Sequence, residues 1–434
     1  MHPEVKFFTD AMAVICALIT FSYYLLLFYK PKRRKADRSF SSVTVIVPAH
    51  NEQRYIEACL LSIIKAEFKG EKEIIVVDDG STDATAEIVS RIKAVTLIRQ
   101  PHRGKAATIN MAIAKAKGEL VAIIDGDTEI DANTLEVMRK DLEQEKTAGT
   151  TCPVGVKNRN VGLLMWLHVE ALYVSLLRSI MTKVNANIIN SGQCGMFRKK
   201  ELVECGGFST FGLSEDMDIA IRLVRAGYHL ALSEGTMAHT NMPDNFAWFW
   251  QQRLRWFRGS LNNVMRHTRL NTGIIDLYSM PLVIYGYVQS LIMGGFTLYK
   301  IMDGYWAHVQ TSGQFLNWPI VAFLIDWVSA VGIVKWTFRL MSGALPFTPV
   351  DLIGAIGSIL SYPLFVIAII KFDKKFDVNH IIPILFMAPL WWLCMIVQVI
   401  CIPELFNKKR YNIWTKPSVN QPLPAPSKAA VGVE

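Results

Sequence analysis

Residues 73–81 have the sequence EIIVVDDGS, an apolar run rich in β-branched residues that ends in an acidic turn. A run of this length and composition predicts a strand that is buried on both faces of a parallel sheet. Similar runs occur at residues 43–47, 95–98 and 120–124, and helical patterns separate the runs at residues 53–65, 84–92 and 105–117. Strands that alternate with helices at this spacing form βαβ units. The sequence therefore predicts an α/β domain with a doubly wound, Rossmann-like sheet.

Polar and charged residues follow all four predicted strands. They occupy residues 48–52, 78–81, 103–105 and 125–127. Ligands of doubly wound sheets bind beyond the carboxyl ends of the strands, so these four segments are expected to meet at one edge. A single acidic strand end is commonly a helix cap, and Asp83 is interpreted as the N-cap of the helix that begins at Ala84. Four charged strand ends in succession favour a ligand site.

Two nucleotide-binding motifs are excluded. Gly104-Lys105 is followed by Ala106 and lacks the upstream glycine of a P-loop, and no Gly-x-Gly-x-x-Gly follows the first strand. These absences remove most of the support for an ATPase or a dinucleotide-binding enzyme.

The second half of the domain is less regular. Residues 161–180 are predicted as a long amphipathic helix that packs against the sheet or the membrane, and residues 191–198 as a glycine-rich turn into a strand. Residues 214–218 (SEDMD) begin a helix that is predicted to end near Gly227. A Ser-Glu-Asp run is by itself a good helix start, with Ser214 as the cap and the acidic side chains in the first turn.

Composition points to a membrane protein. Of the 434 residues, 51% are hydrophobic and only 19% are charged, and the apolar residues are concentrated in long runs. The net charge of +9 gathers beside apolar runs, at residues 30–38 and 408–410, where membrane topology explains it better than nucleic-acid binding does. The seven cysteines lack Cys-x-x-Cys spacing, so neither a disulfide framework nor a zinc site is indicated.

Residues 7–29 are long enough to cross a bilayer, which needs about 20 apolar residues, and the run is too long for the core of a signal peptide. The basic residues 30–35 follow directly, so the positive-inside rule predicts an amino terminus outside and a cytoplasmic domain after it. Four more apolar spans are predicted at residues 280–299, 318–338, 350–370 and 381–402. The protein is thus expected to lie in the plasma or inner membrane.

Two features bear on the number of spans. Four trailing spans leave the basic residues 407–410 in the cytoplasm, but they put Lys371, Lys374 and Lys375 outside, against the positive-inside rule. A re-entrant third span would lower the count and place the tail outside. Residues 421–434 are rich in Pro and Ala and are predicted to be disordered.

Residues 244–256 combine aromatic, arginine and glutamine side chains just before the apolar spans. This composition suits a helix at the membrane surface, with aromatic rings at headgroup level. Read alone, the helix is as well explained as an amphipathic connector. The predicted organisation is therefore a transmembrane helix (1–30), a cytosolic domain (40–240), interfacial helices (241–275), about four transmembrane helices (276–405) and a basic tail (406–434).

With these motifs, the chain resembles the membrane-embedded family 2 glycosyltransferases, which include hyaluronan, chitin-oligosaccharide, poly-N-acetylglucosamine and cellulose synthases. The resemblance covers residues 7–414 and rests on four ordered motifs. They are Val-Asp-Asp-Gly-Ser at 77–81, Asp-Gly-Asp at 125–127, Ser-Glu-Asp at 214–216 and Gln-x-x-Arg-Trp at 252–256. Ser214 stands where the family commonly has threonine, and the hydroxyl is kept. The resemblance implies a GT-A-like cytosolic domain.

The resemblance also implies a UDP-sugar donor, a divalent metal (Mg²⁺ or Mn²⁺) and inversion at the anomeric carbon. It assigns Asp127 as the direct metal ligand, with Asp125 as the nucleotide-side partner that shares the metal. The further residues assigned to the nucleotide-sugar are Pro48, Glu52, Asp79 and Lys105. A hard cation held by carboxylates can neutralise the charge that develops on the leaving diphosphate. His239 is a weaker candidate metal ligand, and a buried structural histidine is the favoured interpretation.

For catalysis, inversion in one displacement requires a base for the acceptor hydroxyl, and the resemblance assigns this role to Asp216. Glu215 is an alternative by spacing. Arg255 is assigned to the departing diphosphate, Gln252 to the acceptor or diphosphate, and Trp256 to stacking on the acceptor sugar. The turn at Ser191-Gly192 corresponds to the acceptor path of hyaluronan and chitin-oligosaccharide synthases.

The leading prediction is a processive transferase that polymerises a UDP-sugar, first of all UDP-N-acetylglucosamine, and threads the polysaccharide through its own spans and across the lipid bilayer. A non-processive synthase of a membrane glycolipid, of the diacylglycerol or ceramide type, shares the same motifs. A catalytically silent sensor of nucleotide-sugars or a transport subunit is the third alternative. No motif in the sequence specifies the donor sugar, the linkage, the product length or the partner subunits.

Overall fold

The computed structural model describes residues 3–32, 34–159, 162–188, 192–269, 273–345, 348–373 and 375–406. These residues form two compact units. The sheet unit lies within residues 34–154 and 189–241, and the helical unit lies within residues 1–33, 155–188 and 242–409. The predicted basic tail and Ser191 lie outside the described residues.

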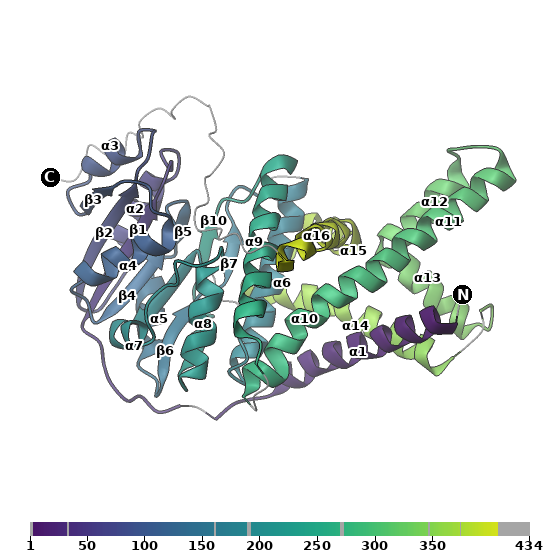
Figure 1. Cartoon of the computed structure of the whole chain (residues 1–434), viewed down its shortest axis with the longest axis horizontal. Coiled ribbons are helices and arrows are strands. Elements are labelled where there is room, and N and C mark those ends of the chain that lie inside the picture. The colour runs from purple at the N-terminus through teal and green to yellow at the C-terminus, as the bar shows by residue number, and fades with distance from the viewer. Residues whose placement is uncertain are drawn as a thin grey trace. The chain divides into compact units, whose positions relative to one another are not determined.

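A seven-stranded sheet with the order β3-β2-β1-β4-β8-β6-β9 forms the centre of the sheet unit (Figure 1). The first four strands are parallel, with β2 and β4 on either side of β1, as the sequence predicts. Antiparallel pairing begins where β8 joins β4. The strands are β1 (Ser42–Ala49), β2 (Glu71–Asp79), β3 (Thr96–Gln100), β4 (Leu120–Ile124), β6 (Thr147–Thr151), β8 (Cys194–Arg198) and β9 (His229–Leu232).

The four helices predicted in the sheet unit are present, with starts or ends shifted by one to three residues. Two further helices, at residues 134–142 and 199–204, were not predicted. Val45, Val47, Val76 and Ile124 of the sheet are almost completely buried, together with Ile56 of the first helix. Burial of these apolar side chains stabilises the sheet and its packing against the helix. The helices are α2 (Ile56–Lys65), α3 (Thr85–Ser90), α4 (Lys105–Lys115), α5 (Thr134–Leu142), α7 (Lys199–Glu204) and α8 (Glu215–Arg225).

A second, smaller sheet pairs β5 (Thr128–Ile130) antiparallel with β10 (Ala238–Thr240). It begins directly after the acidic turn at residues 125–127, so it supports that turn. The chain leaves the sheet unit along β7 (Val154–Val156).

The helical unit contains the apolar segments. Four of its helical stretches are long and apolar enough to cross a membrane: residues 6–28, 163–182, 275–312 and 349–372. Its elements are α1 (Pro3–Phe28), α6 (Leu163–Thr182), α9 (Phe246–His267), η1 (Ile275–Ser279), α10 (Met280–Gln289), η2 (Ser290–Gly294), α11 (Gly295–Ser312), α12 (Trp318–Val328), α13 (Ala330–Met341), α14 (Pro349–Phe372), η3 (Val378–His380), α15 (Ile381–Leu385), α16 (Ala388–Cys401) and η4 (Ile402–Phe406).

Two of the four predicted trailing spans, at residues 318–338 and 381–402, are broken helices. α12 and α13 meet at an angle of 94°, and residues 378–385 meet α16 at 48°. At the first break, a Cβ on Gly332 would lie 1.6 Å from the carbonyl oxygen of Asp326, so only glycine fits there. The third trailing span, for which a re-entrant course was the alternative, is one helix of 24 residues, α14.

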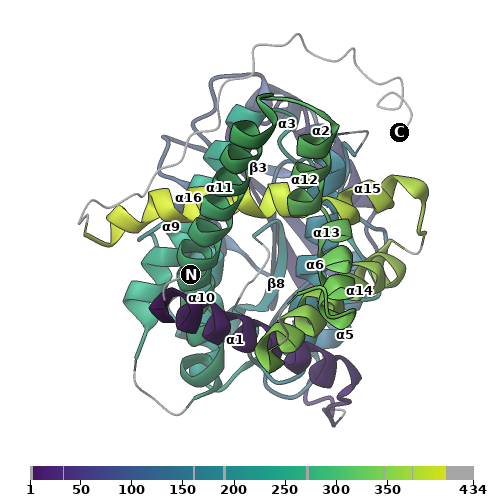
Figure 2. The ribbon, with the colours of Figure 1, turned by 90° about the vertical axis from the view of Figure 1, so that its right-hand side faces the viewer.

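α1 and α14 pack against each other in parallel (Figures 1 and 2). The paired positions advance together along both helices: Gly354 with Ala13, Gly357 with Ala17, and Leu360 with Tyr24. Small residues at such a contact let two helix backbones approach closely. Lys371, at the end of α14, therefore lies at the same end of this helix pair as Lys30, which follows α1.

Candidate active site

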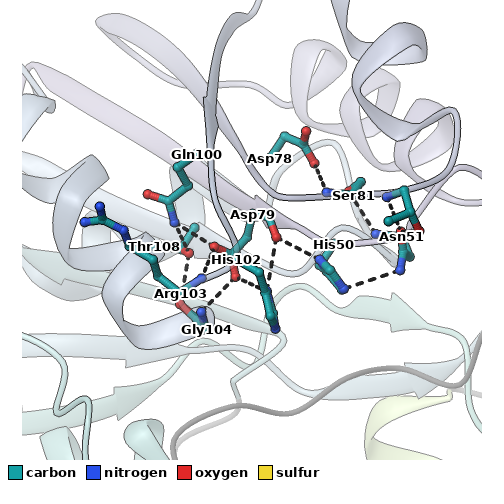
Figure 3. A network of polar contacts seen from close by, with 11 residues as sticks. His50, Asn51, Asp78, Asp79, Ser81, Gln100, His102, Arg103, Gly104 and Thr108 are labelled. Atoms are coloured by element: carbon teal, nitrogen blue, oxygen red, sulfur yellow. Dashed lines mark hydrogen bonds and ion pairs between the residues drawn. The ribbon is translucent and has the colours of Figure 1, made fainter.

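Asp79, at the end of β2, organises the turn that leads into α4 (Figure 3). Its carboxylate accepts hydrogen bonds from the Gln100 side chain at 2.7 Å and from the backbone N–H groups of Arg103 and Gly104 at 2.8 and 2.9 Å. Burial alone would raise the pKa of Asp79, but these hydrogen bonds hold its pKa below the usual value. Gly104 adopts φ = +88°, which suits glycine and allows the turn to close. Asp79 thus shapes the strand end directly before Lys105.

Two histidines flank Asp79 (Figure 3). Nδ1 of His50 lies 2.8 Å from the Asp79 carbonyl oxygen, and Nδ1 of His102 lies 2.8 Å from the Asp79 carboxylate. The imidazole rings stack with their centroids 4.3 Å apart. Next to them, Asn51 accepts a hydrogen bond from the backbone N–H of Thr82 at 2.9 Å. The ends of β1, β2 and β3 are therefore held together by polar contacts, as the sequence predicts for one sheet edge.

Lys105, the first residue of α4, is the charged centre of this edge. Its Nζ lies 2.6 Å from Asp125 Oδ1 and 3.6 Å from Glu215 Oε1, and it donates to the carbonyl oxygen of Gly192 at 3.1 Å. Burial opposes the charged ammonium, but the attraction of Asp125 and Glu215 raises the pKa of Lys105 above its usual value. The cation is therefore retained where four segments of the chain meet.

Gly192 has no side chain, which leaves space between Lys105 and Asp216. A Cβ at this position would lie 3.1 Å from Asp216 Oδ2 and 3.4 Å from Lys105 Nζ. Asp216 and Lys105, which are 111 residues apart in the sequence, thus approach the same glycine. A small pocket with polar and apolar walls lies here. It is lined by Lys105, Ile109, Ile123, Gly192, Gly195, Phe197, Phe208, Glu215 and Asp216.

The turn at residues 125–127 brings two carboxylates together. Hydrogen bonds fix its backbone, because the N–H of Asp125 donates to the Gln193 carbonyl at 3.0 Å and its carbonyl accepts from Thr128 N–H at 2.9 Å. Burial raises the pKa of Asp125, and the negative charge of Asp127 raises it further, whereas Lys105 lowers it. Two carboxylates that repel each other in a polar turn fit a divalent cation, which prefers oxygen ligands.

The remaining predicted nucleotide residues line the end of β1. Pro48 pairs in register with Val77 of β2. Glu52 is buried, and its backbone N–H donates to Thr85 Oγ1 at 2.8 Å. Its side chain approaches the acidic turn, because a Cβ on Gly126 would lie 3.1 Å from Glu52 Cγ. The structure therefore brings Glu52 to the same turn as Asp125 and Asp127.

Capping differs in detail from the prediction. Ser214 occupies the N-cap of α8, but its side chain makes no capping hydrogen bond, and Asp216 Oδ1 instead accepts from the Met217 N–H at 2.8 Å. Ala84 rather than Asp83 occupies the N-cap of α3, although Asp83 Oδ1 still accepts from the N–H of Thr85 at 2.9 Å. Short acidic side chains thus bind the free N–H groups of both first turns.

His239 lies on β10, where its Nε2 is 3.1 Å from Asp131 Oδ1. Thr240 Oγ1 lies 3.5 Å from Asp127 Oδ1, and the Asn241 side chain donates to the Asp127 carbonyl at 3.2 Å. The charge of Asp131 thus accounts for the position of His239. The antiparallel pairing of β5 with β10 determines this placement, and it depends on residues that are far apart in the sequence.

In the helical unit, Gln252, Arg255 and Trp256 lie on α9, as predicted. Nε2 of Gln252 lies 3.9 Å from the sulfur of Met242. Between Gln252 and Arg255 lies Arg253, for which the sequence pattern indicated no role of its own. It is only 4% exposed and forms a two-pronged ion pair with Glu170 of α6. Glu170 carries no motif, so the pair becomes visible only when α6 and α9 are placed together.

A cluster of His168, Asp373 and His380 has the composition of a metal site, since its ligand atoms lie within 4.8 Å of one another. The imidazole hydrogen bonds argue against a metal. The Val156 N–H lies 3.3 Å from His168 Nδ1, Arg159 Nη1 contacts His168 Nε2, and the Asp377 N–H lies 3.1 Å from His380 Nδ1. Three of the four ring nitrogens therefore already face N–H groups. Arg159 adds a positive charge 2.7 Å from Asp373. We interpret the cluster as a structural network of hydrogen bonds.

Residues 44–206 match the sequence model of the family described as Glycosyl transferase family 2. The matched region includes the strand ends that carry Asp79, Lys105 and Asp125. Among solved structures, the fold is similar to a mannosyltransferase from Pyrobaculum calidifontis that was determined in complex with GDP-Man and Mn²⁺. That likeness has a TM-score of 0.53 at 20% identity and covers 84% of this chain and 99% of the other. Residues 44–206 therefore resemble a family 2 glycosyltransferase domain, and the fold is GT-A-like α/β.

Particular relatives are polysaccharide synthases. The poly-β-1,6-N-acetyl-D-glucosamine synthase of Staphylococcus aureus (strain COL) is 26% identical over 266 residues, which are 58% of this chain and 64% of that protein. The synthase of the same description from Staphylococcus epidermidis is 22% identical over 421 residues, which are 91% of this chain and 93% of that protein. The first alignment spans less than two thirds of its relative. The resemblance expected from the four motifs is confirmed.

Proposed function

We propose that the protein is an inverting, metal-dependent glycosyltransferase that adds sugars from a UDP-sugar, first of all UDP-N-acetylglucosamine, to a growing β-linked polysaccharide. The observation that carries the proposal is the meeting of Lys105, Asp125 and Asp216 around Gly192. A cation, a metal-binding turn and a carboxylate base are the parts that this chemistry needs. The names of the relatives support a polymer of N-acetylglucosamine.

Donor binding is assigned to the carboxyl edge of the sheet. Asp79 holds the turn before α4, which presents Lys105 toward the diphosphate as a point charge. Glu52 and Pro48 border the nucleoside side of the same edge. Asp125 and Asp127 would hold Mg²⁺ or Mn²⁺, and such a cation neutralises the charge that develops on the leaving diphosphate.

Asp216 is proposed as the base that takes the proton of the acceptor hydroxyl during the displacement. Its carboxylate faces Gly192, whereas Glu215 is directed to the ammonium of Lys105 at 3.6 Å. Neighbouring residues on a helix point about 100° apart, which explains why the two acids have different partners. Of the two alternatives in the sequence, this geometry favours Asp216 as the base and gives Glu215 an electrostatic role on Lys105.

The acceptor side rests on the resemblance. Arg255 is assigned to the leaving diphosphate, Gln252 to the acceptor or diphosphate, and Trp256 to stacking on the acceptor sugar. Ser191 and Gly192 are assigned to the acceptor path. The narrow surroundings of Gly192 support that assignment, because any larger residue would meet Asp216.

We further propose that the helical unit spans the membrane and carries the product across it. If Lys30 is cytoplasmic, the parallel packing of α1 and α14 makes Lys371 cytoplasmic as well, and the positive-inside rule then holds at both places. The broken pair α12–α13 would enter and leave the membrane on one side. This topology replaces the four simple trailing spans that conflicted with Lys371 and Lys375.

The test is a transfer assay with the full chain purified in lipid nanodiscs. Incubation with UDP-N-acetylglucosamine and Mg²⁺ or Mn²⁺ should give a polymer whose masses differ by one sugar residue, and a chelator should abolish it. Mixed UDP-sugars in one reaction would identify the donor by product mass. Formation of a glycolipid without polymer would contradict the proposal and favour the lipid-modifying alternative.

A further inference from the structure

Arg253 lies inside the helical unit with its guanidinium between two aromatic rings of its own helix. Its Cζ is 5.0 Å from the ring centroid of Phe249, four residues before, and 4.7 Å from that of Trp256, three residues after. Residues at these spacings lie on one face of a helix. The side chain is almost completely buried, so the cation–π contacts are formed away from water, where they are strongest.

Glu170 on α6 fixes the plane of this guanidinium. Arg253 Nη1 donates to Glu170 Oε1 at 2.7 Å, and Nη2 donates to Oε2. Two parallel hydrogen bonds define both the position and the tilt of an arginine. The tilt of the guanidinium is therefore set by a second helix and not by the flexible arginine chain.

A stacked ring takes its orientation from the surface on which it lies. Trp256 lies against a guanidinium whose plane is held by Glu170, so this contact restrains the indole. Lysine at position 253 would keep the charge but would lose both the two-pronged contact and the flat surface. The chemistry of this contact explains why an arginine occupies this buried position next to Trp256.

We infer that Arg253, held by Glu170, is a positioning residue that sets the orientation of the Trp256 indole for the acceptor sugar. The inference rests on the acceptor role proposed for Trp256. A sugar stacks on an indole only when the ring presents its face, and small displacements of positioning groups lower rates strongly. Arg253 itself does not contact the sugar or the diphosphate in this assignment.

The first measurement is independent of activity. The full chain is labelled with 5-fluorotryptophan, and the Trp256 resonance is identified by its loss in Trp256→Phe. Arg253→Lys and Glu170→Gln should shift or broaden this resonance. Arg266→Lys, an exposed arginine in the last turn of the same helix, is the matched control and should leave it unchanged. An unchanged Trp256 resonance in both Arg253→Lys and Glu170→Gln would overturn the inference.

The second measurement is a double-mutant cycle in the transfer assay. Arg253→Lys should lower transfer on the order of tenfold to a hundredfold, through the acceptor KM or kcat, with UDP affinity unchanged. Arg253→Lys should cause no further loss in the Trp256→Ala background, because its effect runs through that ring. Additive losses would mean that Arg253 acts on the fold in general and would also overturn the inference.

The two measurements separate the inference from the proposed function. Wild-type transfer by Trp256→Ala would remove the acceptor role of Trp256 and thus the functional part of the proposal. The fluorine spectra would still decide whether Arg253 orients the ring. If Arg253→Lys does not fold, Glu170→Gln keeps one neutral hydrogen-bonding partner and carries both tests.

Discussion

The two units of this protein hold their charged side chains in different ways. In the sheet unit, charged and polar groups lie on short loops after the strands and have both backbone and side-chain partners, as with Asp79, which accepts from the Gly104 N–H and from the Gln100 side chain. In the helical unit, Arg253 and Glu170 meet across two helices, with aromatic rings around them. The loops place charges of both signs at one edge of the sheet, whereas the two-pronged contact joins two helices. Substitutions in the two units should therefore differ in how much they lower transfer activity and how much they lower Tm.

The largest effect is expected from Asp216→Asn in the sheet unit. The amide cannot accept the acceptor proton, so transfer should fall about 10²- to 10⁴-fold, the usual contribution of a general base. UDP affinity, measured by calorimetry, should stay close to that of the wild type, because the side chain is not assigned to the nucleotide. Normal transfer by this variant would show that the base is another group, with Glu215 as the next candidate.

Asp79→Asn should lower the stability of the folded protein, and not only its activity, because Asp79 holds the turn after β2. The amide keeps one oxygen, so one of the two backbone N–H groups loses its acceptor, and loss of a hydrogen bond to a charged group costs about 1.5–3 kcal/mol. The folded-state pKa of Asp79 is lowered, so its stabilisation is complete above the unfolded value of about 3.9 and is lost as pH falls through the lower folded value. The difference in Tm between wild type and variant should therefore narrow only below about pH 3.9. A constant difference down to pH 2.5 would contradict this account.

Gly357→Ala probes the helical unit, where packing rather than polar contact is expected to dominate. The new Cβ would lie 2.8 Å from Ala17 Cβ and 2.9 Å from Ala17 Cα, so α1 and α14 must separate. We expect a loss of about 1–3 kcal/mol, seen as a lower Tm in nanodiscs. Gly286→Ala in α10 is the matched control, since nothing lies within 4 Å of its added Cβ. Equal stability of the two variants would refute the close parallel contact.

Gly192→Ala should have the smallest effect and should separate activity from stability within the sheet unit. The added methyl group would press on Asp216 Oδ2 and Lys105 Nζ, which can shift slightly. Transfer should fall on the order of tenfold with little change in Tm. Gly235→Ala is the control, because its Cβ would meet Val137 at an ordinary contact distance of 3.7 Å. A drop in Tm without loss of transfer would assign Gly192 to folding.

The strands and helices of the first sheet half were predictable, because local apolar periodicity specifies them. Residues 125–127 could also be predicted as part of a ligand site, because they directly follow a strand that is recognisable in the sequence. The strand β8 was predicted, but its antiparallel pairing with β4 and the strand β6 were not, since that pairing depends on residues far apart in the sequence. The bends between α12 and α13 and before α16 escaped prediction as well, because hydropathy averages over a break of one or two residues.

By itself, the sequence determined the α/β class, the order of the four motifs and the apolar segments, because each depends on neighbouring residues. The tertiary structure decided which acid faces Gly192, which side chain holds Lys105, and that Arg253 rather than a motif residue is buried between Phe249 and Trp256. It also decided that α1 and α14 run in parallel. These features depend on contacts between distant segments, whose geometry is set by packing and not by local composition.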